Sequence, residues 1–175
     1  MSWAAEEFKT LDLGDARLNR RAVLLAERLA HKPGSSIPNA CQNWSETVAA
    51  YRFLSNEDVS WDDVMQSHGQ ASEQRIGQHA VVLCLQDTTE LDFNGQQMKG
   101  LGPLSYEAQR GLYLHPTYVV TPDREPLGVT NAWTWAREFK APDGTRPGVL
   151  ESTRWIESYE RVVEQAQRLP QTRHV

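Results

Sequence analysis

The chain has 175 residues and a formal net charge of −5, and its 39% hydrophobic and 23% charged residues are ordinary for a soluble globular protein. The longest apolar run, Ala80–Leu85, is too short to cross a bilayer, and residues 1–15 contain no apolar stretch of signal-peptide length. Cys41 and Cys84 lie far apart and form no metal-binding spacing, so we expect a cytoplasmic protein that has no membrane partner.

The first predicted helix runs from Ala16 to about Ala30, with Asp15 as its N-cap. The net charge alone argues against a nucleic-acid partner, because contacts with phosphates need a basic face. Residues 16–32 nevertheless contain five basic residues and one acidic residue, which gives this segment a charge of +4. On a helical wheel the apolar face is formed by Leu18, Ala22, Leu25 and Leu29. A basic cluster lies roughly 100° from that face, and it is formed by Arg17, Arg21 and Arg28, with Arg20 near them. Such a cluster can contact DNA phosphates, or it can be the solvated side of an amphipathic helix.

Two further helices are predicted before the pattern changes at Gly77. One covers about Glu46–Leu54, with Asn43 or Ser45 near its cap, and the other runs from after Ser60 to about Arg75. Ala80–Leu85 has no polar alternation and is rich in branched residues, which predicts a strand buried on both faces.

The rest of the chain predicts a hairpin and a helix. Leu112–Val120 and Leu127–Trp135 are the expected strands, joined by a turn over residues 122–126. A helix begins at Glu151 or Ser152 and has one apolar stripe, formed by Trp155, Ile156, Tyr159, Val162, Val163, Ala166 and Leu169. The sequence therefore predicts an α+β chain, with a helical domain over residues 1–78 and an α/β unit of three strands and one helix over 79–175.

Asp87 is the strongest candidate for a chemical role. It follows the predicted strand Ala80–Leu85, and a carboxylate at a strand end is held by the sheet while it remains open to solvent. Mg²⁺ prefers oxygen ligands held in this way. The alternative is that Asp87 only turns or caps the chain. Glu90 and Asp92 follow closely, but we expect the strand to have ended before them, so that nothing directs them to the same point.

Several segments, in order, resemble bacterial insertion-sequence transposases of the Tn-five-like group, in the insertion-sequence-four family. Residues 11–21 resemble the opening of these proteins, residues 50–56 resemble their next block, and residues 85–91 resemble the block that holds their first catalytic aspartate. The later matching segments are residues 100–102, 110–112 with His115, 126–129, 133–137 and 151–155. The ordered set covers nearly the whole chain.

The resemblance implies a helical DNA-binding domain followed by a ribonuclease-H-like catalytic domain of the DDE class. Members of the family bind transposon ends as double-stranded DNA, then cut and join DNA with two divalent ions, Mg²⁺ or Mn²⁺. Carried over by position, Asp87 matches the first metal-ligating catalytic aspartate, and Arg21 and Arg52 match arginines of the end-binding region. Arg17 and Arg28 join them as DNA-binding candidates from the helical wheel alone.

The second aspartate and the glutamate of the family lie beyond residue 175. We therefore expect a truncated ribonuclease-H-like domain whose sheet edge and apolar helix stripe lack some partners. We also expect the chain alone to be inactive and to bind neither ion tightly. An alternative hypothesis is that the chain is a non-enzymatic regulator, which either binds transposon ends or forms inactive complexes with full-length transposase. A homo-oligomer, or an α+β domain that has lost its DNA function, is also compatible with the sequence.

Overall fold

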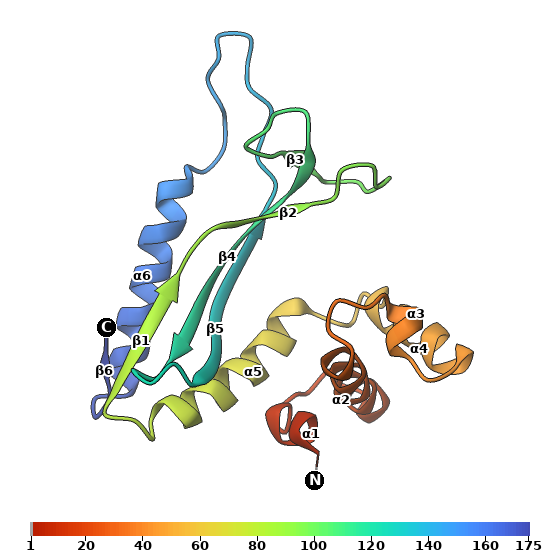
Figure 1. The fold of residues 1–175 in the computed structure, drawn as a ribbon, viewed down its shortest axis with the longest axis vertical. Coiled ribbons are helices and arrows are strands. Elements are labelled where there is room, and N and C mark those ends of the chain that lie inside the picture. Colours follow the sequence, from red (N-terminus) through yellow and green to blue (C-terminus); the bar gives the residue numbers. More distant parts are fainter. Residues whose placement is uncertain (1) are drawn as a thin grey trace. The chain divides into compact units, whose positions relative to one another are not determined.

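The computed structural model describes residues 2–175, which form two compact units divided after Ala71. The first unit is helical, and the second is a mixed sheet with helices (Figure 1). The division lies inside helix α5, Trp61–Ile76, seven residues before the boundary expected at residue 78. No helix among residues 2–175 is long and apolar enough to cross a membrane.

The first unit contains α1 (Trp3–Glu7), α2 (Ala16–His31), α3 (Ile37–Ala40), α4 (Trp44–Leu54) and the first part of α5. The predicted helices are confirmed, whereas α1 and α3 were not predicted. Local caps explain this success. The Asp15 side chain accepts a hydrogen bond from the backbone N–H of Arg17 at 2.7 Å, and Asn43 accepts one from Glu46 at 2.9 Å.

One apolar cluster holds these helices together. The buried residues that form it are Leu11, Leu13, Ala22, Leu25, Cys41, Ala50 and Phe53. Ala22 and Leu25 are on the predicted apolar face of α2, whereas Leu29, at the end of that face, is 38% exposed. The apolar face of α2 is thus buried where α4 packs on it, while Arg17 and Arg20 at the start of the helix are exposed.

The second unit contains six strands, not the three that were predicted. They are β1 (Val81–Gln86), β2 (Thr89–Asp92), β3 (Gly102–Pro103), β4 (Arg110–Val120), β5 (Pro126–Trp135) and β6 (Arg173–His174), with α6 (Glu151–Arg168). The long strand β4 pairs antiparallel with β1, β2, β3 and β5, and β6 pairs parallel with β1. The strands that were missed are two to four residues long and depend on partners distant in sequence. The α+β class is confirmed.

The expectation that β1 is buried on both faces is wrong. Val82 is fully buried, but Leu85 is 50% exposed. Gln86 and its pairing partner Thr117 point to the face on which Ser158 of α6 lies, because Thr117 Oγ1 is 3.3 Å from Gln86 Nε2 and 2.8 Å from Ser158 Oγ. Leu85 points to the opposite face, since side chains alternate along a strand.

Helix α6 lies along the sheet (Figure 1). Part of its contact with the sheet is polar, because Ser158 bonds to Thr117 of β4. Ser158 and Gln165 are buried, at 0% and 1% exposure, whereas Ile156 and Tyr159 of the predicted apolar stripe are 60% and 65% exposed. A hydroxyl pair can be buried at little cost when its members bond to each other, as Ser158 and Thr117 do. The apolar stripe is therefore only partly covered by the described residues.

Candidate nucleic-acid interface and carboxylate site

The basic side of α2 begins with Arg17, whose side chain is 83% exposed. Its guanidinium lies 3.3 Å from the Asp15 carboxylate. The backbone N–H of Arg17 is the main cause that lowers the pKa of Asp15, followed by the Arg17 side chain. Arg20 is exposed and Arg21 is half-buried. Arg17 is thus tethered at the helix start, but most of its side chain is open to a partner.

Arg28 has a different environment from Arg17. It joins α2 to α4 through a two-bond pair with Glu46, from Arg28 Nε to Oε2 at 2.9 Å and from Nη2 to Oε1 at 3.0 Å. The two side chains are 22% and 18% exposed. Two parallel bonds between a guanidinium and a carboxylate fix the orientation of both side chains. Arg28, predicted as a DNA contact, fastens two helices of this unit to each other.

The same pair should make the first unit sensitive to acid. The Arg28 side chain, and then the backbone N–H of Gln42, lower the pKa of Glu46 from its ordinary 4.5 to about 2. A carboxyl whose pKa is lower in the folded state stabilises the fold above its unfolded pKa, and this contribution is lost as the pH falls toward the folded pKa. We expect stability of the first unit to fall between pH 4.5 and about 2, and this fall should be smaller in Glu46→Gln. Amide hydrogen exchange in α2 and α4 across this range measures the difference, and equal pH dependence in both proteins would contradict it.

Arg52 is exposed on α4 between an exposed and a buried aromatic residue. Tyr51 is 50% exposed, whereas Phe53 is 6% exposed and belongs to the core. Trp44, which was not predicted to have a role, is 77% exposed at the start of the same helix. Its exposure could not be predicted, because a sequence alone does not show which aromatic residues are buried. Helix α4 therefore presents both Arg52 and aromatic side chains.

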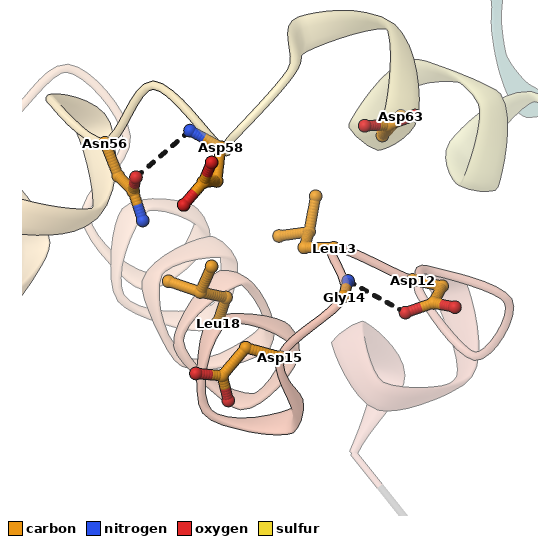
Figure 2. Close-up of a pocket in the computed structure, with 8 residues that line it drawn as sticks. All are labelled: Asp12, Leu13, Gly14, Asp15, Leu18, Asn56, Asp58 and Asp63. Carbon is orange, nitrogen blue, oxygen red and sulfur yellow. Dashed lines mark hydrogen bonds between the residues drawn. The ribbon is translucent and has the colours of Figure 1, made fainter.

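An acidic pocket of about 610 Å³ lies beside the start of α2 (Figure 2). Its lining consists of Asp12, Leu13, Gly14, Asp15, Leu18, Asn56, Asp58 and Asp63. Internal hydrogen bonds shape it, since the backbone N–H of Gly14 donates to Asp12 at 2.9 Å and that of Asp58 donates to Asn56 at 3.0 Å. Four aspartates without a basic lining residue repel phosphates. DNA is therefore expected on the basic surface of α2 and α4 and not at this pocket.

Asp87 follows β1 directly, as predicted, and its carboxylate is exposed. Asp87 Oδ1 accepts a hydrogen bond of 2.8 Å from the backbone N–H of Thr88. The Thr88 hydroxyl is in turn 2.8 Å from Nδ1 of His115, which is fully buried on β4. Burial is the main cause that lowers the pKa of His115, and the nearby charges of Asp87 and Glu151 oppose it. The buried strand β4 thus anchors the turn that carries Asp87.

β1 ends before Glu90 and Asp92, as expected, but both residues lie on a further strand, β2, which was not predicted. Glu90 accepts hydrogen bonds from the Tyr113 hydroxyl at 2.8 Å and from the backbone N–H of Ser105 at 2.7 Å. Asp92 accepts one from the Gln109 side chain at 3.1 Å. Among residues 2–175 no three His, Cys, Asp or Glu side chains come together as metal ligands. Asp87 therefore fits a single oxygen ligand of a divalent ion, and the described residues do not fit a whole two-ion site.

Residues 1–59 match the protein family described as transposase DNA-binding. The match covers α1 to α4, including the basic side of α2 and the exposed Arg52. It supports DNA as a partner of this part of the chain, as in a transposase-like protein. The match ends before α5 and the sheet, so it does not extend to Asp87.

Proposed function

We propose that this chain binds transposon-end DNA as part of a transposase of the DDE class, and that Asp87 is the first acidic ligand of its catalytic site. The observation that carries the proposal is the match of residues 1–59 to the transposase DNA-binding family. The ordered resemblance over residues 85–155 supports the catalytic part.

Arg17, Arg21 and Arg52 are the proposed DNA-contacting residues. Arg17 is largely exposed, and Arg52 is exposed on α4, the helix that packs against α2. Arg21 lines the same small cavity as Glu46 and Ala50, which places it beside α4. These cations can therefore reach one DNA surface while Arg28 holds the helices in place. Arginine suits this task because its planar donors match phosphate oxygens.

Asp87 is proposed as one oxygen ligand for Mg²⁺ or Mn²⁺. An exposed carboxylate at the end of β1, with its turn anchored by Thr88 and His115, has the fixed position that such a ligand needs. In a complete enzyme the divalent ions would stabilise the attacking and leaving oxygens of DNA cleavage. Further acidic ligands are required for that chemistry.

The experiment that tests DNA binding is the double substitution Arg17→Ala/Arg21→Ala in the 175-residue chain. Each cation that leaves a phosphate reduces the slope of log affinity against log salt by about 0.9, so the slope should fall by about 1.8. Fluorescence anisotropy with a labelled transposon-end duplex measures both affinity and slope. Arg161→Ala is the control, because Arg161 is an exposed arginine of α6 that pairs with Glu164 of the same helix. Unchanged affinity and slope in the double variant would contradict the proposed surface.

A further inference from the structure

We propose that the segment joining β5 to α6 forms a second DNA contact, a basic pocket that binds a backbone phosphate on the side of the sheet unit where Asp87 lies. The inference depends on the proposed function for the identity of its ligand, because it takes DNA as the source of the phosphate. The pocket is formed wholly within residues 105–151, outside the part matched to the DNA-binding family. The joining segment extends beyond the sheet (Figure 1).

The pocket has a volume of about 440 Å³ and a lining richer in bases than in acids. Its basic residues are Arg137, Lys140 and Arg146, and its acidic residues are Glu107 and Glu151, so the lining has a net positive charge. The acidic pocket of the first unit has four aspartates and no base. This second cavity is therefore the one of the two whose charge can attract a phosphate.

Lys140 and Arg146 meet at a single carboxylate. Lys140 Nζ is 3.0 Å from Oε1 of Glu107, and Arg146 Nη2 bonds to the same oxygen. The Lys140 side chain, and then the charge of Arg146, lower the pKa of Glu107. Cations that bind a carboxylate oxygen in this way can also bind a phosphate oxygen. Glu107 is 47% exposed, so an incoming phosphate can compete with it for both cations.

Arg137 is held at the pocket by a stack of rings and guanidinium groups. Its guanidinium lies 4.3 Å from the centre of the Tyr113 ring and 2.7 Å from Glu151. Tyr113 stacks on Trp135 with a centroid separation of 5.5 Å, and Arg154 lies 5.7 Å from the Trp135 ring. A cation fixed in this way loses little conformational freedom when a ligand binds. The stack gives Arg137 a defined orientation before any phosphate arrives.

The strand register places this pocket near Asp87. Tyr113 is paired with Trp135 at the pocket, and the adjacent residue Leu114 is paired with Thr89, two residues after Asp87. The charges of Asp87 and of the pocket residue Glu151 both act on His115, where they oppose the lowering of its pKa by burial. A DNA strand that reaches Asp87 therefore has a basic pocket beside it.

The simplest alternative is that these ion pairs only fasten the joining segment to the sheet. The structural role and the phosphate-binding role predict different DNA affinities for Glu107→Gln. If the pairs are only structural, removing the carboxylate loosens the segment and does not raise DNA affinity. If the pocket binds phosphate, Glu107→Gln releases Lys140 and Arg146 from their internal partner, so DNA affinity rises and its salt dependence steepens.

The test uses the 175-residue chain and a labelled DNA duplex, with affinity measured by fluorescence anisotropy over a range of salt concentrations. Lys140→Gln/Arg146→Gln should weaken binding and reduce the salt slope by up to about 1.8, whereas Glu107→Gln should strengthen binding. Glu164→Gln is the matched control, because it removes one exposed, paired carboxylate from α6 and changes the net charge equally. An equal effect of Glu107→Gln and Glu164→Gln, with no effect of the double variant, would overturn the inference.

Nuclear magnetic resonance of the labelled chain separates this inference from the proposed function. Addition of duplex should shift amide signals in residues 137–149 as well as in α2 and α4, and the shifts in 137–149 should disappear in Lys140→Gln/Arg146→Gln. Shifts in α2 and α4 without shifts in 137–149 would overturn the second contact and leave the first intact. Inorganic pyrophosphate is the second probe, and shifts of 137–149 with pyrophosphate but not with duplex would overturn DNA as the source of the phosphate.

Discussion

Asp87→Asn is expected to abolish DNA cleavage by a longer chain that supplies the remaining acidic ligands, while its binding of transposon ends stays unchanged. The substitution keeps the size of the side chain and its ability to accept the bond from the N–H of Thr88. It removes the negative charge that a divalent cation requires. Loss of a residue that only hydrogen-bonds to a metal ligand costs roughly 10–100-fold in metal affinity or activity, so loss of a direct ligand should cost more than roughly 100-fold.

Cleavage of a labelled transposon-end duplex in Mg²⁺ and in Mn²⁺ measures this effect, with anisotropy as the binding control. Asp92→Asn is the matched variant, because Asp92 is a nearby carboxylate on β2 that accepts hydrogen bonds from the backbone N–H of Asn94 and the side chain of Gln109. Normal cleavage by Asp87→Asn would show that the catalytic position is misassigned. A large fall in thermal stability would instead favour the turn-or-cap role of Asp87.

Gly128→Ala is expected to destabilise the sheet unit by about 3 kcal/mol, through backbone strain and overpacking together. Gly128 lies on β5 opposite Val119 and has a φ of 141°, a backbone conformation that residues with a Cβ rarely adopt. An added Cβ would lie 2.0 Å from Ser72 Oγ and 2.9 Å from Ser72 Cβ. Since Ser72 is fully buried on α5, it has little room to move away.

Gly144→Ala separates the two causes. Gly144 also has a positive φ, of 85°, but an added Cβ there meets no atom within 4 Å. It should therefore cost only about 1 kcal/mol, from backbone strain alone. Amide hydrogen exchange of β4 and β5 reports the stability of the sheet unit in both variants. Equal destabilisation by the two substitutions would show that contact with Ser72 does not matter.

Helix positions could be predicted because their signals are local. Asp15 and Asn43 cap the helices that follow them, and each bond joins residues two or three apart. The short strands could not be predicted, because their pairing depends on distant residues such as Arg173 with Val81. The buried face of α6 was also misjudged, since Ser158 is buried through a bond to Thr117, 41 residues away.

The candidate sites show the same limit. The position of Asp87 at a strand end could be read from the buried run before it, while its chemical role stays a prediction. The helical wheel grouped Arg28 with Arg17 and Arg21, but it could not show that Glu46 of another helix pairs with Arg28. The basic pocket was missed because Glu107 and Arg146 are 39 residues apart, and only the fold brings them together.

Because the division between the two units lies inside α5, a fragment that contains the sheet unit has to include the last turns of this helix. Ile76 is fully buried with Val82, Val119 and Leu127, although it precedes the sheet in sequence. Arg75 Nε donates a hydrogen bond of 2.6 Å to the carbonyl of Leu127. A fragment that begins at residue 79 would lose both and leave apolar side chains of the sheet uncovered. A fragment that begins before Ser72 keeps them, so the last turns of α5 belong with the sheet in any dissection of this protein.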